Sequence, residues 1–424
     1  TGPAPDERPV LIPAPQKTIW GDGTYRLPER LQLGIADTAL IAAAGYVNEV
    51  LAPYGTVAVD RCDRGDIVLE LDSAALPPEG YRLSVTHAGV RIGGGSYRGV
   101  VNGIATLRQL LPAKAGSGAK IPYAEIADRP AFGWRGVMLD VSRHFFDKEE
   151  IFTLLDQMAR LKLNKFHWHL TDDQGWRIEI PCYPELTQEG AWRLFNRQDT
   201  LCMGRAAREQ NDDFLLPVRR LRTDGADTLY GGYYTRKEVV AYAAVRGIDV
   251  IPEIDMPGHC LQAIDSYPWL ACFGRGSWGQ SFSSPLCVGK DRTLAFCESV
   301  WEELFELFPY EYVHMGGDEV DKSNWKRCPD CQTRMRAEGL PDEAALQAWF
   351  MHRMQRFCEA RGRRMIGWDE ILEGGAVPGA TVMWWRPWEP QSVSVATRQG
   401  CEVVLCPQSW FYFSLEEDAN SLAR

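Results

Sequence analysis

One stretch of the chain reads Tyr312-Val313-His314-Met315-Gly316-Gly317-Asp318-Glu319, an apolar run that ends in two glycines and two adjacent carboxylates. Neighbouring side chains on a strand point to opposite faces, so both carboxylates reach one pocket only if the backbone turns there. Two close carboxylates also raise the pKa of one of them, which suits a general acid that works near neutral pH. A solvated acidic turn is the plainer alternative, and the rest of the chain decides between the two.

Six further apolar runs follow the same rhythm of strand and then helix from Gly133 onward. The seven expected strands cover residues 137–139, 165–170, 248–251, 312–315, 365–368, 382–385 and 403–405, with an amphipathic helix at 151–161. This alternation predicts a parallel sheet with crossover helices. Seven such strands favour a (β/α)₈ TIM barrel over an open sheet, although an eighth strand is not evident. No dinucleotide-binding glycine pattern follows any strand.

Polar side chains cluster directly after these strands. They are Asp140, Arg143 and His144; Asp172 and Asp173; Glu253, Asp255 and His259; Asp318 and Glu319; Trp368, Asp369 and Glu370; and Trp385 with Arg386. In a barrel all of these positions lie at the C-terminal face of the sheet, where active sites are built. The pattern therefore predicts an enzyme site and disfavours the solvated turn.

The first 128 residues differ in character and are expected to form a separate small α/β domain, followed by the barrel over 129–424. Alternating residues at 81–85 and 89–92 predict two strands, and apolar spacing over 99–111 predicts a helix that Pro112 ends. The length of 424 residues suits a barrel of about 250 residues plus one smaller domain.

Composition excludes several classes of partner. A net charge of −11 argues against nucleic acid, and no run of about 18 apolar residues predicts a membrane span. The chain begins Thr1-Gly2-Pro3 without Met, so we expect a processed N-terminus and a secreted, periplasmic or cell-surface location. The oligomeric state is not readable from the sequence.

The 12 cysteines are spread along the chain. Cys328-Pro329-Asp330-Cys331 has half of a zinc-ribbon spacing, but no second Cys-x-x-Cys and no His pair completes it. A local disulfide or free structural thiols are therefore expected there in preference to a metal.

Four motifs in order resemble glycoside hydrolase family 20, the β-N-acetylhexosaminidases. They are Arg135 to Asp140, His167 to Trp176, Pro252 to His259, and His314 to Glu319. The resemblance covers nearly the whole chain, including the N-terminal region. It implies a retaining exo-enzyme that releases terminal β-linked N-acetylglucosamine or N-acetylgalactosamine from a glycan. It also implies substrate-assisted catalysis through an oxazolinium intermediate, with no metal or organic cofactor.

The resemblance assigns roles residue by residue. Glu319 is expected to act as general acid and then base, and Asp318 to orient the acetamido N–H and stabilise positive charge. His259 with Asp172 or Asp173 is expected to form a relay that tunes Glu319. The expected substrate-binding residues are Arg135, Trp368, Trp385, Tyr412 and His314. For Arg135 the alternative is a structural ion pair with Asp140 or another carboxylate, and for Trp384 the barrel core is favoured.

Two features depart from the family pattern. Ser414 stands where the family has an Asp, and no Trp-x-Glu of an eighth strand follows Tyr412, so we expect the chain to be incomplete. The loop after the second strand holds seven arginines: Arg193, Arg197, Arg205, Arg208, Arg219, Arg220 and Arg222. They suggest a sulfated or otherwise anionic glycan, a hypothesis that equal rates on 6-sulfated and plain N-acetylglucosaminides would contradict. A solvated loop face is the alternative.

Two rival functions remain open. His167-x-His169 at a strand end could belong to a metal-dependent hydrolase of the amidohydrolase kind, but the only histidine after Glu319 is His352, in a helical stretch. The second rival is a catalytically impaired glycan-binding protein of the same fold, favoured by the absent eighth strand. Loss of activity with retained sugar binding in Glu319→Gln would separate an enzyme from a lectin.

Overall fold

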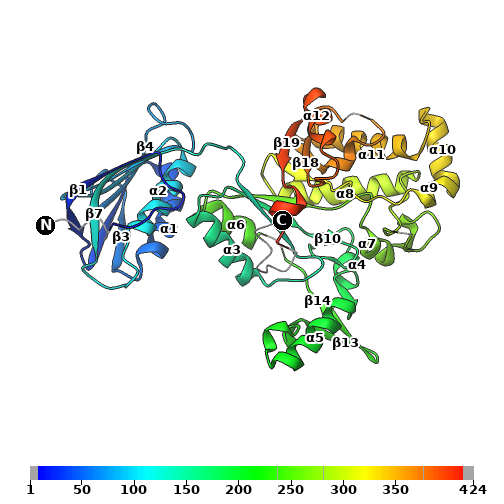
Figure 1. Ribbon diagram of the computed structural model, residues 1–424, viewed down its shortest axis with the longest axis horizontal. Helices are drawn as coiled ribbons and strands as arrows, with labels where there is room; N and C mark the ends of the chain where they lie inside the picture. The colour runs from blue at the N-terminus through cyan, green and yellow to red at the C-terminus, as the bar shows by residue number, and fades with distance from the viewer. Residues whose placement is uncertain (1–7, 236, 280, 376, 414–424) are drawn as a thin grey trace. The chain divides into compact units, whose positions relative to one another are not determined.

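A computed structural model describes residues 8–413 apart from 236, 280 and 376 (Figure 1). The chain forms two compact units, each interrupted in sequence. The first holds residues up to 137, 147–166 and 238–250, and the second holds 138–146, 167–237 and 251 onward. The boundary at residue 128 that the sequence suggests coincides with the end of a strand, and as a domain boundary it stays a prediction.

The first unit contains a seven-stranded sheet in the order β1-β7-β5-β6-β4-β2-β3. Its strands are β1 (Lys17–Arg26), β2 (Arg30–Ile35), β3 (Thr56–Asp60), β4 (Ile67–Leu71), β5 (Tyr81–Thr86), β6 (Gly89–Gly94) and β7 (Lys120–Asp128). Its helices are α1 (Ile41–Leu51), α2 (Tyr97–Leu110), α3 (Lys148–Arg160) and α6 (Glu238–Val245). The two strands and the two helices expected at 81–85, 89–92, 99–111 and 151–161 are confirmed.

Helix α2 lies close against this sheet because it carries two glycines one turn apart. A Cβ on Gly99 would stand 2.3 Å from the carbonyl oxygen of Gly80, and one on Gly103 would stand 2.4 Å from Ile92. Ser96 caps the helix by accepting the N–H of Arg98. Any side chain at either glycine would therefore push the helix away from β5 and β6.

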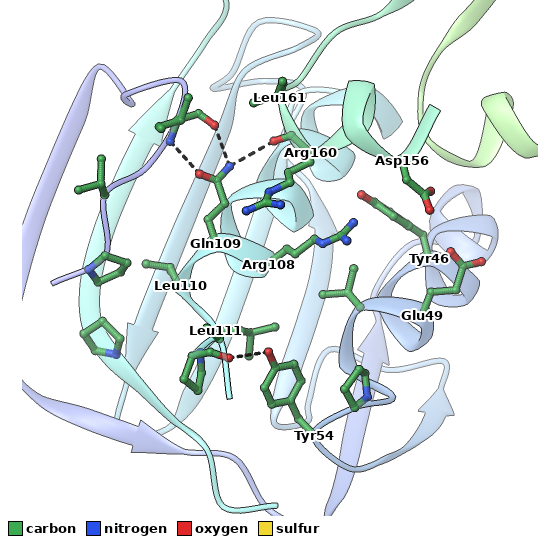
Figure 2. A pocket seen from close by; sticks show the side chains of 18 of the residues that line it. Tyr46, Glu49, Tyr54, Arg108, Gln109, Leu110, Leu111, Asp156, Arg160 and Leu161 are labelled. Carbon is green, nitrogen blue, oxygen red and sulfur yellow. Dashed lines mark hydrogen bonds between the residues drawn. The ribbon is translucent and has the colours of Figure 1, made fainter. Parts of the chain in front are cut away.

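A cavity of about 1320 Å³ lies in the first unit, between α1, α2 and α3 (Figure 2). Gln109 closes one side of it by exchanging two hydrogen bonds with the backbone of Ile12, at 2.7 and 2.8 Å. Tyr54 closes another by donating to the carbonyl of Pro112 at 2.7 Å. None of the site residues expected from the sequence lines this cavity.

The parallel sheet has the order β19-β18-β17-β16-β15-β9-β8. Its strands are β8 (Gly136–Asp140), β9 (Lys165–His169), β15 (Asp249–Glu253), β16 (Tyr312–His314), β17 (Arg364–Trp368), β18 (Thr381–Trp384) and β19 (Glu402–Leu405). All seven expected strands are confirmed, and β9 and β15 are buried along their whole length. Fully buried strands without alternation are typical of parallel sheets covered on both faces. The curled parallel sheet agrees with a TIM-type barrel.

Within residues 8–413, β19 and β8 are the two ends of this sheet and no eighth strand joins them. Ser414 lies outside the described residues, and so does any strand beyond it. The expectation that the chain is incomplete stays a prediction. In the part of the chain that the structure describes, no helix has the length and apolar character needed to cross a membrane.

The second unit adds helices and small hairpins around its strands. The helices are α4 (Glu185–Gln188), α5 (Arg197–Glu209), α7 (Leu261–Ser266), α8 (Asp291–Leu307), α9 (Ser323–Arg327), α10 (Pro329–Glu338), α11 (Glu343–Glu359), α12 (Gln391–Arg398) and α13 (Gln408–Phe411). The short strands are β10 (Thr171–Asp172), β11 (Gly175–Trp176), β12 (Trp192–Leu194), β13 (Leu221–Asp224) and β14 (Asp227–Gly231). Helix α5 and the β13–β14 hairpin, drawn in green, carry most of the arginine-rich segment (Figure 1).

Candidate active site

His259 stands at the centre of four carboxylates. Its Nδ1 lies 3.2 Å from Asp172 Oδ1 and 3.4 Å from Asp173 Oδ2. Its Nε2 lies 3.5 Å from Asp318 Oδ2 and 3.3 Å from Glu319 Oε2. The structure thus brings together all five residues that the sequence suggests for catalysis, although the distances are long for hydrogen bonds, as is common in unliganded sites.

Electrostatics make His259 a cation. Burial alone lowers the pKa of an imidazole, but the charge of Asp172 and the acceptor oxygens of Asp172, Asp173 and Asp318 outweigh burial and raise the pKa of His259. The pKa of Asp172 is lowered despite its burial, because Arg143 and His259 stabilise its charge. The raised pKa favours the doubly protonated ring of His259, which can donate toward both carboxylate pairs.

The backbone turns sharply where the two carboxylates follow β16. Gly316 and Gly317 have φ of +66° and +92°, and Glu319 itself has a φ of +50°. A Cβ at Gly316 would stand 1.8 Å from Asp255 Oδ1, so no other residue fits there. His259 also has a positive φ, +49°. Such conformations cost energy in non-glycine residues and concentrate at functional sites. The turn that the sequence required for Asp318 and Glu319 to face one partner is present.

Two carboxyl groups close to Asp318, those of Asp255 and Glu370, have raised pKa values. Burial, and then the charge of Asp318, raise the pKa of Asp255. The same two causes raise the pKa of Glu370 to about 8. Asp255 accepts the N–H of Gly317 at 3.3 Å, and Glu370 accepts the indole N–H of Trp385 at 3.0 Å. Two carboxyls beside Asp318 are thus held toward their neutral forms.

Glu253 is a buried anion beneath this cluster, and sequence reasoning gave it no role. It has no exposed side-chain surface and contacts three imidazoles and one indole: His169 at 2.6 Å, Trp368 at 2.7 Å, His167 at 2.8 Å and His314 at 3.2 Å. The three imidazoles lower the pKa of Glu253 despite its burial. The signal was visible in the sequence, because Glu253 ends a strand whose neighbours end in His169 and His314.

This arrangement changes the interpretation of His314 and of the His167-x-His169 motif. His314 has no exposed side-chain surface, and its ring packs against His167 and Trp368. The structure therefore does not bring His314 to where a sugar could touch it, contrary to the sequence-based expectation. His167 and His169 both face the same oxygen of Glu253, which is the geometry of a hydrogen-bonded hub. His352 lies on α11.

The aromatic residues expected to bind the sugar occupy two places. Trp368 is 4% exposed and directs its indole N–H to Glu253. Trp385 stacks with Tyr412 at a centroid distance of 6.3 Å and an interplanar angle of 17°. Trp384 is buried and donates to the carbonyl of Glu389, in agreement with its expected core position. Burial raises the pKa of Tyr412, so its hydroxyl stays a donor.

The structure does not place Arg135 at the candidate site. Arg135 precedes the first residue of β8, whereas Asp140 is the last, and five residues rising about 3.3 Å each separate the two ends by ~16 Å. Its guanidinium forms a two-pronged pair with Glu79, at 3.0 and 3.2 Å. The structural ion pair considered as the alternative is what forms, with Glu79 as the partner.

Arg143 is the arginine that lies at the correct end of β8. Its guanidinium lies 2.9 Å from Asp140, 2.6 Å from Asp172 and 3.1 Å from His169 Nε2. Its side chain stays 43% exposed, so N–H groups remain available to a ligand. The sequence contained the signal, since Arg143 follows the strand and Arg135 precedes it.

We expect Arg143→Gln to reduce activity and Arg135→Gln to reduce stability. Arg143→Gln removes a charged donor from the site and should lower kcat/KM by about 10- to 100-fold, the value of a lost hydrogen bond to a charged group. Arg135→Gln breaks the pair with Glu79 and should lower the melting temperature while leaving kcat/KM of the folded enzyme within about two-fold. Steady-state kinetics and thermal melts on both variants check this. A larger loss of kcat/KM in Arg135→Gln than in Arg143→Gln would instead support Arg135 as the substrate-binding arginine.

Several arginines of the loop after β9 are engaged within the second unit. Arg193 pairs with buried Asp199 at 2.5 Å, and Arg205 pairs with Glu209 at 2.8 Å on α5. Arg222 lies over the ring of Trp192. These pairs favour the solvated, internally neutralised loop, and an anionic substrate stays a hypothesis.

Three groups around the site have metal-ligand spacing: His167, Glu253 and His314; Asp172, Asp173 and His259; and Asp255, His259 and Asp318. The first group surrounds Glu253 and the other two include His259, so all three consist of side chains that contact these two residues or their neighbours. We therefore interpret these three groups of described residues as parts of the hydrogen-bond and charge network around Glu253 and His259.

Comparison with known proteins gives one family for nearly the whole chain. The description "Glycosyl hydrolase family 20, catalytic domain" matches residues 132–423, and "Glycosyl hydrolase family 20, domain 2" matches residues 8–129. A beta-hexosaminidase of Porphyromonas gingivalis is 39% identical over 396 residues, which cover 89% of this chain and 47% of that protein. The chain thus spans about half the length of this curated relative.

Solved structures agree with this match. The β-N-acetylhexosaminidase of Bacteroides fragilis superimposes with a TM-score of 0.80 at 32% identity, covering 95% of this chain and 76% of that one. The family 20 exo-β-N-acetylglucosaminidase of Vibrio harveyi, solved with N-acetylglucosamine, gives 0.78 at 31% identity, with 94% and 60% covered.

Proposed function

The chain belongs to glycoside hydrolase family 20, and on that premise we propose that it releases terminal β-linked N-acetylglucosamine or N-acetylgalactosamine from glycans as a retaining exo-β-N-acetylhexosaminidase. The observation that carries the proposal is the convergence of Asp318 and Glu319 on one nitrogen of His259. The N-acetylglucosamine bound to the Vibrio harveyi relative supports the choice of sugar.

The proposed reaction is substrate-assisted. The acetamido oxygen of the sugar attacks the anomeric carbon while Glu319 gives its proton to the departing glycosidic oxygen, and an oxazolinium ion forms. Glu319 then takes a proton from water, which attacks the anomeric carbon and reopens the ring with retention. Asp318 accepts the acetamido N–H and stabilises the positive charge that develops on the ring.

The remaining residues position these two carboxylates and the sugar. His259, held by Asp172 and Asp173 on one ring nitrogen, faces Asp318 and Glu319 with the other and positions both side chains. The exposed edge of Arg143 is available to sugar hydroxyls. Trp385 and Tyr412 form a stacked pair that suits the acetamido methyl and the pyranose face.

The test compares an aryl β-N-acetylglucosaminide with the matching aryl β-glucoside, with and without a thiazoline mimic of the oxazolinium. We expect turnover of the acetamido substrate alone, because the nucleophile belongs to the substrate, and inhibition by the thiazoline. Equal turnover of both substrates would contradict substrate assistance.

A glycan-binding protein is the second candidate, because β19 and β8 do not pair with each other within residues 8–413. Tight thiazoline binding without turnover of either substrate would favour it. Absence of both binding and turnover would contradict the two candidates for this chain.

A further inference from the structure

Four cysteines of the second unit meet in one cluster that the proposed reaction does not use. They are Cys272, Cys287, Cys328 and Cys331, and all four sulfurs lie within 4.8 Å of one another. Three of them are buried, Cys272 is half-buried, and none forms a disulfide. Because the cluster joins residues up to 59 positions apart, the spacing along the sequence did not reveal it.

The distances between the sulfurs have the size of a metal tetrahedron. Cys287 Sγ lies 3.6 Å from Cys328 Sγ and 3.7 Å from Cys331 Sγ, and Cys272 Sγ lies 3.9 Å from Cys331 Sγ. Four sulfurs around zinc, each about 2.3 Å from the ion, stand about 3.8 Å apart. A disulfide requires about 2.05 Å. We propose that these four cysteines bind one Zn²⁺ as a structural tetrathiolate site.

The local backbone is shaped for such a site. Cys328 is the N-cap residue of α10, and Cys331 lies in its first turn. The Cys-Pro-Asp-Cys segment therefore turns at the start of the helix, which brings both sulfurs to one side. Opposite it, the N–H of Lys290 bonds the carbonyl of Cys287 at 3.2 Å and forms a tight turn. A Cβ on Gly289 would stand 2.3 Å from the backbone nitrogen of Cys331. Only glycine lets the two turns approach closely enough to share an ion.

The charge balance also fits zinc. Binding converts four thiols to thiolates and releases four protons, so the occupied site carries a net charge of −2. The Lys290 ammonium is held nearby by the carbonyls of Trp269 and Ala271, at 3.2 and 2.6 Å. Sulfur ligands in a closed, buried tetrahedron select zinc for a structural role, because no open position remains for substrate or water.

The proposed ion would fasten together the two loops that build the candidate active site. Cys272 and Cys287 belong to the long connection after β15 that also carries His259, and Leu286 in it bonds Pro257 at 2.8 Å. Cys328 and Cys331 follow the turn that carries Asp318 and Glu319, and Trp325 bonds the carbonyl of Leu286 at 2.9 Å. The zinc would thus hold His259 against the carboxylates from a distance.

The experiment measures metal in the whole purified chain by elemental mass spectrometry after gel filtration without chelators. We expect about one zinc per chain. The double variant Cys328→Ser, Cys331→Ser should lose the metal, whereas Cys297→Ser and Cys358→Ser, which change buried cysteines outside the cluster, should keep it. Less than about a tenth of a zinc per wild-type chain, or disulfides among the four cysteines in peptide maps, would overturn the proposal.

A second measurement does not depend on the variants folding. X-ray absorption at the zinc edge of the wild-type protein should show four sulfur neighbours at about 2.3 Å and no oxygen or nitrogen. Cobalt exchanged into the chain should give the intense visible bands of a tetrahedral thiolate complex. Zinc bound through nitrogen or oxygen would place the ion elsewhere and contradict the assignment. Both readouts are independent of hydrolytic activity, so they stand whether or not the proposed function holds.

Discussion

Glu319→Gln should lower kcat/KM on an aryl β-N-acetylglucosaminide by about 10²- to 10⁴-fold, the usual contribution of a general acid and base. The amide cannot give a proton to the departing oxygen or take one from water. The loss should be smallest for aglycones that leave easily and largest for alkyl or sugar aglycones, which need the proton most. Thiazoline affinity should change little, because Asp318 remains.

The control for this variant is Glu306→Gln, which changes an exposed carboxylate on α8. It should keep wild-type kinetics and the wild-type melting temperature. If Glu319→Gln lost the same factor on all aglycones, Glu319 would not be the proton donor. If wild type and Glu319→Gln bound sugar equally and neither turned it over, the glycan-binding alternative would hold.

Asp318→Asn should lower kcat by about 10²- to 10³-fold, the cost of removing one preorganised electrostatic partner from a charge that develops in the transition state. The affinity of the Asp318→Asn variant for the thiazoline should fall in proportion to its kcat/KM, because that mimic carries the oxazolinium shape and charge. KM for the neutral substrate should change far less. Steady-state kinetics and thiazoline inhibition constants on the same preparation measure both effects.

The matched control is Asp227→Asn, which changes an exposed carboxylate in the β13–β14 hairpin. Its kcat and its affinity for the thiazoline should equal those of the wild type. An Asp318→Asn variant with full thiazoline affinity would show that Asp318 does not face the acetamido group. The comparison also separates the two neighbours: loss at Glu319 should depend on the aglycone, and loss at Asp318 should follow the affinity for the mimic.

Much of the fold was determined by the sequence alone. Most strands of the parallel sheet have an apolar centre and are followed by polar residues, and that pattern located all seven strands, from β8 to β19. The pattern is informative because a strand buried on both faces is mostly apolar, and the functional side chains of a barrel lie mainly where its strands end. The same reasoning placed Asp172, His259, Asp318 and Glu319 at one face.

Only the tertiary structure decided which polar residues face the site and which lie beneath it. Arg135 precedes β8 and Arg143 follows it, so the length of the strand separates them, and Arg135 pairs with Glu79. The His314 side chain points inward to Glu253, a carboxylate that lies 61 positions earlier in the sequence. The four cysteines met through loops from different strands. Sequence spacing gives the face of one element, whereas contacts between distant elements depend on how their backbones pack together.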